Sequence, residues 1–290
     1  MRTEQEMLNL ILTTAREDER IRAVILNGSR ANPNARVDIF QDFDVVFVVP
    51  ETDSFKQDLN WIDRFGELMI LQLPEEMQDP PPAEDGCQVY LMQFMDGNRI
   101  DLTLFPLARL DRLERDSLSI LLLDKDGLIE PFPPPDERDY LPQPPTAKQF
   151  SDCCNEFWWV SAYAAKGLWR REFLYARTNL DEYMRTQLMK MLVWLIGMRT
   201  NFERSPGKLG KHFKTYLTVA EWEQLMRTYA DANYEHTWDA LESMAKLFRQ
   251  SALLVAEHFD LAYPYQDDAR VWAHLQHVRR LPPDATQMYP

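Results

Sequence analysis

Hydrophobic and polar positions alternate with two different spacings along this chain of 290 residues. Over residues 3–17 the apolar side chains recur every three or four positions, which predicts a helix with one buried face. Short β-prone runs follow at 21–26 and 43–49, and the second ends at a proline. The pattern then favours a helix over 54–66 and a strand over 67–72. The amino-terminal part therefore combines helices with strands.

A second pair of strands is expected at 88–95 and 98–105. An Asp-Gly dipeptide joins them, which is a strong signal for a two-residue hairpin. A short helix near 107–116 and an apolar run at 120–123 follow. Because helices are mixed here with at least one antiparallel hairpin, we predict the α+β class, with a mixed β-sheet flanked by helices.

The proline content marks a boundary between two domains. Residues 131–145 hold seven of the 19 prolines, and proline can continue neither a helix nor a central strand. We therefore expect a first domain over 1–135, a stiff connector over 136–145 and a second domain over 146–290. Almost everything beyond the connector has helical spacing, so the second domain is predicted to be a helical bundle, with helices at 146–170, 172–200, 218–231, 235–261 and 267–280.

Charge narrows the classes of partner. There are 46 acidic and 32 basic side chains, which gives a formal charge of −14 at pH 7. A negative field repels phosphate backbones and attracts cations, so nucleic acid is disfavoured and a polycationic small molecule is favoured. The same charge is also explained by solubility alone.

Three cysteines without a ligand spacing give neither a disulfide framework nor a zinc site. The amino terminus lacks the unbroken apolar core of a signal peptide, and no run approaches the roughly 20 apolar residues needed to cross a bilayer. We therefore expect a cytoplasmic protein without membrane contact.

The chemistry is concentrated at five residues of the first domain. Gly28-Ser29 follows a predicted buried strand, and a turn with exposed N–H groups and a hydroxyl can cradle a phosphate. Asp42 and Asp44 begin the next strand, where alternation directs both carboxylates to one face. Asp101 lies among apolar neighbours in a later strand. Each feature alone is common in turns and at strand ends, but the combination is far more specific.

Converging carboxylates repel one another unless a cation neutralises them. Mg²⁺ prefers oxygen ligands and leaves positions open for substrate phosphates, and two such ions can hold both oxygens of an in-line displacement. The sequence thus predicts a magnesium site, with a third carboxylate able to accept a hydroxyl proton.

These segments resemble the nucleotidyltransferase superfamily related to DNA polymerase β, through LNGSR at 26–30, QDFDVVF at 41–47 and RIDLTLF at 99–105. More narrowly, the chain is similar to the bacterial aminoglycoside 6-adenylyltransferases over nearly its whole length. Further segments that carry this likeness are DERIRAVILNGSRANPN, FQDFDVVFVV, DGNRIDLTLFPL, LLLDKDG and PPTAKQFSDCCNEFWWVSAYAAKGL.

The resemblance implies transfer of AMP from ATP to the 6-hydroxyl of streptomycin, with release of pyrophosphate. It implies that Asp42 and Asp44 bind Mg²⁺ and that Asp101 completes the metal site and acts on the attacking hydroxyl. Gly28, Ser29 and Arg30 would contact the nucleotide. These roles are expectations carried by the matching motifs.

The helix over 146–170 has two stripes. One is apolar and predicted to be buried, with Phe150, Cys153, Cys154, Phe157, Ser161, Ala164, Ala165 and Leu168. The other mixes acids, aromatic residues and a lysine, and its commonest explanation is a solvated face. If it faces the substrates, Lys166 would bind a β- or γ-phosphate of ATP. Guanidinium groups of the drug would then be bound by Asp152, Glu156, Trp159 and Tyr163.

Two alternatives stay open at this point. The acceptor could be another aminoglycoside, a lincosamide or another small polar molecule. The chain could also be a non-catalytic, antitoxin-like binding protein, although a pure binding role has no need for three converging carboxylates.

Overall fold

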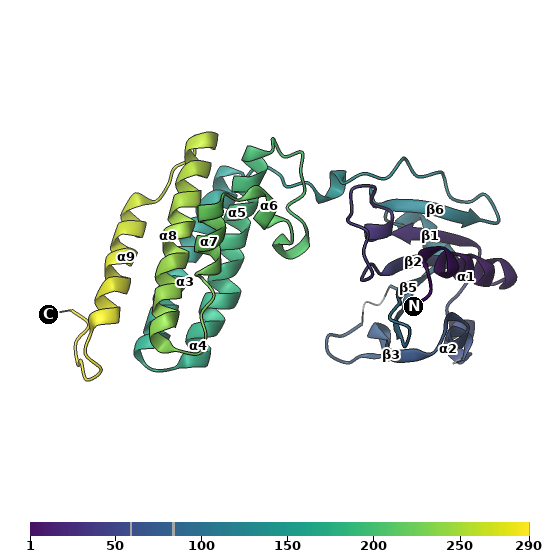
Figure 1. Ribbon diagram of the computed structural model, residues 1–290, viewed down its shortest axis with the longest axis horizontal. Coiled ribbons are helices and arrows are strands. Elements are labelled where there is room, and N and C mark those ends of the chain that lie inside the picture. The colour runs from purple at the N-terminus through teal and green to yellow at the C-terminus, as the bar shows by residue number, and fades with distance from the viewer. Residues whose placement is uncertain (59, 83–84, 290) are drawn as a thin grey trace. The chain divides into compact units, whose positions relative to one another are not determined.

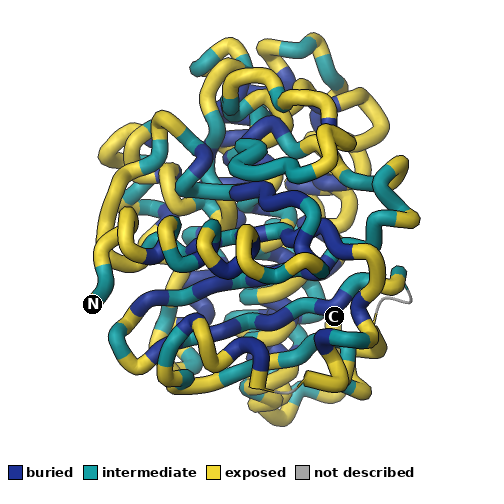
Figure 2. Tube along the Cα trace, turned by 90° about the vertical axis from the view of Figure 1, so that its right-hand side faces the viewer, coloured by how far each residue is buried: buried dark blue, intermediate teal, exposed yellow. Residues whose placement is uncertain are grey.

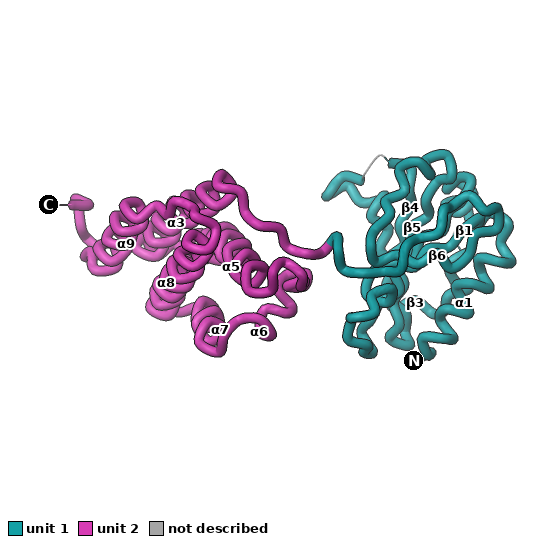
Figure 3. The backbone as a smooth tube through the Cα atoms, turned by 90° about the horizontal axis from the view of Figure 1, so that it is seen from above, with its two compact units in different colours: residues 1–139 teal, residues 140–290 magenta. Residues whose placement is uncertain are grey.

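A computed structural model describes residues 1–58, 60–82 and 85–289. The chain forms two compact units, Met1–Asp139 and Tyr140–Pro290 (Figure 3). We call them the amino-terminal unit and the helical unit and describe each by itself. The chain passes from one unit to the other within the segment 136–145 that the prolines mark as a connector.

The amino-terminal unit is built on a six-stranded sheet of order β3-β4-β5-β2-β1-β6 (Figure 1). Its strands are β1 (Ala23–Asn27), β2 (Phe43–Val49), β3 (Leu68–Gln72), β4 (Gln88–Phe94), β5 (Arg99–Pro106) and β6 (Ser119–Asp124). Neighbouring strands are antiparallel, except for the parallel pair β2–β5. The sheet is therefore mixed, and the α+β class is confirmed.

One face of the sheet carries the main core of this unit. The helix α1 (Glu4–Glu17) packs there, and it begins at a capping box formed by Thr3 and Glu6. The short helix α2 (Asp53–Gln57) and a 3-10 turn at Trp61–Phe65 complete the cover. Strand residues that point to this side are almost fully buried, among them Phe43, Val45, Phe47, Ile100, Leu102 and Leu104.

The opposite face has a much smaller apolar group, formed by Ala23, Ile25, Val48 and Ile129 with the segment near Leu110. Beyond that group, the same face of β2 and β5 carries polar side chains that are only partly buried. One side of the sheet is thus committed to the core, and the other presents polar groups to solvent.

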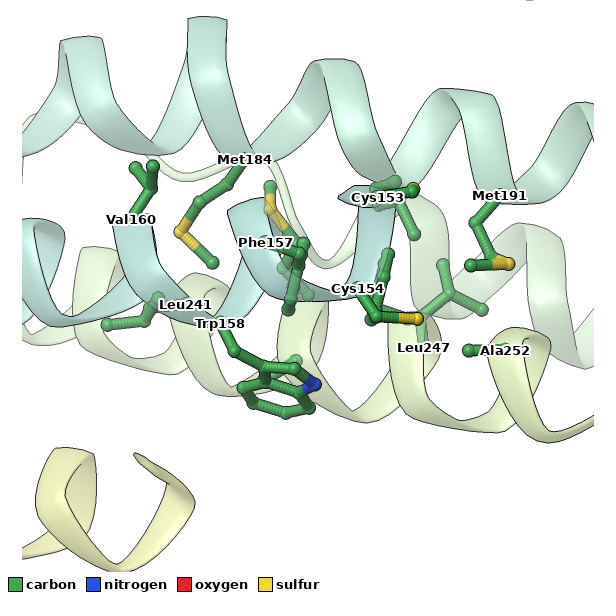
Figure 4. Close-up of a cluster of buried hydrophobic side chains, with 14 of the residues drawn as sticks. Cys153, Cys154, Phe157, Trp158, Val160, Met184, Met191, Leu241, Leu247 and Ala252 are labelled. Carbon is green, nitrogen blue, oxygen red and sulfur yellow. The ribbon is translucent and has the colours of Figure 1, made fainter. Parts of the chain in front are cut away.

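The helical unit confirms the predicted bundle. Its helices are α3 (Ala147–Trp169), α4 (Phe173–Thr178), α5 (Arg185–Arg199), α6 (Phe213–Tyr216), α7 (Val219–Met226), α8 (Tyr234–Phe259) and α9 (Tyr265–Arg280). Buried and exposed positions alternate along these helices. Figure 2 shows the same alternation along the amino-terminal unit. The apolar stripe of α3 is buried as expected, and Cys153, Cys154 and Phe157 point into a cluster with residues of α5 and α8 (Figure 4).

Three predicted helices differ from the structure. The helix expected over 54–66 is divided into α2 and the 3-10 turn, and residue 59 lies outside the described residues. The one near 107–116 is a 3-10 helix at Leu107–Arg112. The long helix over 172–200 contains a π-helical segment at Asn179–Met184, which inserts an extra residue between α4 and α5 and so shifts the face that each presents. The apolar run at 120–123 belongs to the edge strand β6.

Among the described residues, no helix combines the length and apolar character that a membrane span requires.

Candidate functional site

A row of polar residues crosses four neighbouring strands on the open face of the sheet. In the parallel register of β5 and β2, Asp101 lies beside Asp44. Asp44 in turn faces Asn27 across the antiparallel pair β2–β1, and Asn27 faces Ser119 of β6. The Ser119 hydroxyl donates to Asn27 Oδ1 at 2.8 Å. Strand register therefore brings together two carboxylates that are 57 residues apart in the sequence.

Asp42 lies just before β2, and by alternation its side chain shares the face of Asp44. The Asp42 and Asp101 side chains are 39% and 23% exposed. The turn at Gly28–Arg30 abuts the same place, because the Asp44 carboxylate lies directly against Gly28. The structure thus brings Gly28, Asp42, Asp44 and Asp101 together on the open face of the sheet.

Gly28 has φ +73°, a left-handed conformation that disfavours any residue with a Cβ. A Cβ placed there would overlap Asp44 Oδ2 and lie 3.1 Å from Asp44 Cγ. Glycine at this position therefore allows the turn and the Asp44 carboxylate to lie in contact.

Arg30 holds the backbone next to Asp42 in place. Its Nε donates to the Asp42 carbonyl oxygen at 3.0 Å, and its Nη2 donates to the Gln41 carbonyl oxygen at 2.7 Å. The guanidinium lies 3.7 Å from the centre of the Phe43 ring, and the side chain is only 6% exposed. Arg30 thus fixes the backbone that presents Asp42, and its contact with a nucleotide stays a prediction.

Arg99 forms ion pairs with two of these carboxylates, Asp101 and Asp42. Its Nε donates to Asp101 Oδ1 at 2.7 Å and its Nη2 to Asp101 Oδ2 at 2.8 Å, a two-pronged pair. The same Nε is 3.7 Å from Asp42 Oδ2. Both oxygens of Asp101 are therefore engaged by a neighbour two positions earlier on β5.

The donor set fits a hard divalent cation in its chemistry. Asp42, Asp44 and Asp101 offer carboxylate oxygens, the ligands that Mg²⁺ prefers, on a face that stays partly open. Burial raises the pKa of Asp42 above its ordinary value, and the charge of Asp101 adds to this, while Arg99 and Arg30 offset part of it. A cation at this point would relieve that effect.

The side chains do not already surround a metal position. Within residues 1–58, 60–82 and 85–289, no three histidine, cysteine or acidic side chains are gathered closely enough to hold an ion as they stand. This agrees with the engagement of Asp101 by Arg99.

The predicted substrate-binding residues of the helical unit lie along the exposed side of α3. Trp159 is 61% exposed, and its Nε1 donates to the Tyr163 hydroxyl at 2.9 Å. The Lys166 ammonium lies 4.8 Å from the centre of the Tyr163 ring and 5.7 Å from that of Tyr175. Aromatic rings therefore hold Lys166 in place, and its contact with phosphate stays a prediction.

At the start of the same stripe, Asp152 forms an ion pair with Lys148 one turn earlier, and Glu156 is exposed. Since Asp152 and Tyr163 already have cationic neighbours, Glu156 and Trp159 are the members best suited to a further cation. A hollow of about 420 Å³ elsewhere in the helical unit contains none of the predicted site residues and is lined by Arg227, Tyr229, Ala230, Asp231, His236, Asp239 and Ser243.

Comparison with known proteins gives consistent results. A sequence model of the family described as streptomycin adenylyltransferase matches residues 1–278. The chain belongs to the streptomycin adenylyltransferase family. Aminoglycoside 6-adenylyltransferases of Campylobacter jejuni and Bacillus subtilis are 45% and 42% identical to it over 269 residues, which is 92% of this chain and 93% and 94% of theirs.

A crystal structure of an aminoglycoside 6-adenyltransferase from Bacillus subtilis is 36% identical, covers 97% of this chain and 100% of its own, and has a TM-score of 0.48. Membership in the streptomycin adenylyltransferase family, together with the sequence relatives from Campylobacter jejuni and Bacillus subtilis, identifies the chain as a nucleotidyltransferase enzyme.

The raised pKa of Asp42 leads to a stability prediction for this family member. A carboxyl with a raised pKa is protonated more readily in the folded than in the unfolded state, so folding loses stability as the pH rises through that range. In Asp42→Asn the side chain is uncharged, so its burial carries no cost of removing a charge from water. We expect it to raise the melting temperature of the metal-free protein at pH 8 by about 1–2 °C.

Thermal unfolding in EDTA at several pH values between 8 and 4.5 checks this prediction. The gain of Asp42→Asn over the unmodified protein should shrink as the pH falls. A variant that is no more stable than the unmodified protein at pH 8 would contradict it.

Sequence reasoning missed three residues of this site. Arg99 could have been noticed, because a position two before Asp101 shares its face of β5. Asn27 and Ser119 carried no local signal, since their place beside Asp44 depends on the pairing of strands far apart in the chain.

Proposed function

We propose that this nucleotidyltransferase transfers AMP from ATP to the 6-hydroxyl of streptomycin and releases pyrophosphate. Its cofactor in this proposal is Mg²⁺, with two ions bound. The observation that carries the proposal is the convergence of Asp44, Asp101 and Asp42 beside the Gly28 turn in a member of this family. The reaction would take place in the cytoplasm and would protect a cell against the drug.

In this proposal the acceptor hydroxyl oxygen attacks the α-phosphorus of ATP. The bond between that phosphorus and the bridging oxygen to the β-phosphate breaks, and pyrophosphate leaves with the bond electrons. Bound divalent cations would neutralise the charge that develops on the phosphate oxygens. Asp42 and Asp44 would supply carboxylate oxygens to those cations, and Asp101 would complete the site. The Ser29 N–H and hydroxyl would bind the phosphates, since the Gly28 N–H donates to the Leu118 carbonyl oxygen at 3.0 Å.

Asp101 is the proposed acceptor of the hydroxyl proton. Both of its oxygens receive a hydrogen bond from Arg99, and each oxygen keeps a further lone pair that can take the proton. The helical unit is proposed to bind the cationic acceptor through Glu156 and Trp159, with Asp152 and Tyr163 as further contacts, while Lys166 holds the triphosphate. Two guanidinium groups make streptomycin a suitable ligand for an acid beside an aromatic ring.

The direct test mixes the purified chain with ATP, Mg²⁺ and streptomycin. Pyrophosphate release and a mass gain of one AMP on the drug are expected. Product with another aminoglycoside or a lincosamide, but none with streptomycin, would keep the reaction and replace the acceptor. No product with any of these acceptors would contradict the proposed reaction.

Replacement of the exposed Trp159 by alanine tests the acceptor site. We expect Trp159→Ala to weaken streptomycin binding by about tenfold, because a desolvated cation–π contact is worth roughly 1–2 kcal/mol. The KM for ATP should stay within about twofold, as Trp159 is assigned to the acceptor alone. Steady-state kinetics with each substrate varied in turn separates the two constants.

Tyr265→Ala is the matched control, since Tyr265 is an aromatic residue of α9 with a similar exposure of 68%. It should change neither constant. Unchanged streptomycin affinity in Trp159→Ala, or equal losses for ATP and the drug, would remove Trp159 from the acceptor site.

A further inference from the structure

The carboxylate cluster already contains a positive charge from the chain itself. Arg99 makes two hydrogen bonds to Asp101, at 2.7 and 2.8 Å, and its Nε lies 3.7 Å from Asp42 Oδ2. One planar guanidinium therefore touches one carboxylate through both oxygens and approaches a second. No other arginine or lysine in the described residues forms an ion pair within 4 Å of Asp42 or Asp101.

Arg99 also lies where no core side chain bars its way out of the carboxylate cluster. Its side chain is 40% exposed on the open face of the sheet, so it can leave Asp101 without crossing the core. Arg30, by contrast, is 6% exposed and held by two backbone carbonyls. The two arginines beside Asp42 thus differ. Arg30 is fixed, whereas the hydrogen bonds and ion pairs of the Arg99 side chain within the described part of the chain go to carboxylates that a metal ion would also use.

The guanidinium and a divalent ion compete for the same oxygens. The two-pronged pair from Arg99 engages both oxygens of Asp101 in one plane, and a divalent ion would draw on the negative charge of the same two oxygens. Two cations within a few ångströms also repel each other strongly on a partly buried face. The bonds from Arg99 to Asp101 therefore weaken the binding of a metal ion at this carboxylate.

We propose that Arg99 is the built-in counter-cation of the metal-free site, and that a divalent ion binds by displacing its guanidinium from Asp101. The proposal rests on the metal site of the proposed function. Arg99 is a positioning residue here: it keeps the carboxylates together without metal and lowers the affinity of the free protein for metal. Once displaced, its donors are available to an anionic partner.

Binding of Mn²⁺ alone to the full chain, without nucleotide or drug, tests this proposal. The free ion is followed by electron paramagnetic resonance during titration. Arg99→Gln removes the competing charge, so we expect it to bind Mn²⁺ about tenfold more tightly than the unmodified protein. Arg99→Lys keeps the charge but loses the planar pair, and its affinity should lie between the two.

A thermal readout accompanies the titration. In EDTA, Arg99→Gln should melt at a lower temperature than the unmodified protein, because its carboxylates have lost their counter-charge. Mn²⁺ should then raise its melting temperature by more than it raises that of the unmodified protein. Arg99→Lys provides the same comparison if Arg99→Gln does not fold.

Arg22→Gln is the matched control. Arg22 also makes a two-pronged pair with an aspartate, Asp126, through Nε at 2.7 Å and Nη2, but it lies among other residues at the far end of β1. Its loss should leave Mn²⁺ affinity unchanged. Equal strengthening of Mn²⁺ binding in Arg22→Gln would show a general charge effect and overturn the assignment to Arg99.

Asp44→Asn separates this proposal from the proposed function. If Asp44→Asn abolishes Mn²⁺ binding but Arg99→Gln binds no more tightly than the unmodified protein, the metal site stands and the displacement of Arg99 is wrong. If Asp44→Asn binds Mn²⁺ as tightly as the unmodified protein, or if neither of them binds it, the metal site itself is wrong and both proposals fall.

Discussion

Asp44→Asn is expected to lower AMP transfer by about a thousandfold or more while the chain stays folded. Asp44 lies at the centre of the polar row, between Asp101 and Asn27. Its replacement by an isosteric amide removes a negative charge where the proposed reaction holds cations, and groups that stabilise developing charge commonly contribute 10²–10³-fold or more each. The turnover number should fall while the circular dichroism spectrum stays unchanged.

Asp63→Asn is the matched control for this substitution. Asp63 is an exposed aspartate of the same unit, in the 3-10 turn that packs on the other face of the sheet. It loses the same charge and should keep full activity. An Asp44→Asn variant with turnover close to that of Asp63→Asn would remove the metal assignment from this carboxylate.

The local pattern predicted the strand that carries this site because the signal there is strong. The run from Phe43 to Val49 is β-branched or aromatic at all but one position and ends at Pro50, and the structure has β2 with the same bounds. Alternation then placed Asp42 and Asp44 on one face. The buried stripe of α3 was predicted for the same reason, since a helical period of apolar residues leaves little choice of face.

Pairing of distant strands was beyond the reach of such patterns. The hairpin signal predicted β4 as a partner of β5 but gave no sign of β2, and only the parallel register with β2 brings Asp101 beside Asp44. The same holds for Ser119, which belongs to an edge strand that the sequence showed only as an apolar run.

The partners of individual side chains could not be predicted from the sequence either. Arg30 follows Gly28-Ser29 directly and resembles a nucleotide contact by its position in the sequence. In the structure it is buried against Phe43 and bound to backbone carbonyls. A long flexible side chain can reach many partners, so its place in a motif does not decide which partner it takes. Arg99 shows the converse, because no motif included it and its contacts lie at the centre of the site.

Gly28→Ala is expected to damage stability and activity together. A left-handed backbone costs a residue with a Cβ about 1–2 kcal/mol. The added methyl group would also overlap Asp44 Oδ2, so either the turn or the carboxylate has to move. Displacement of a reacting group by about 1 Å can cost about a hundredfold in rate, and we expect a loss of that size or larger in turnover.

Two further variants separate the two effects of this methyl group. Gly127→Ala has the same backbone problem, at φ +64°, but no atom lies within 4 Å of the added Cβ, so it should lose stability and keep activity. Gly28→Ala combined with Asp44→Ala removes the overlap and should recover part of the lost stability without any activity. Chemical denaturation and turnover measured on all four proteins give the comparison. If Gly28→Ala is as active as Gly127→Ala, close contact between the turn and Asp44 is not needed for the reaction.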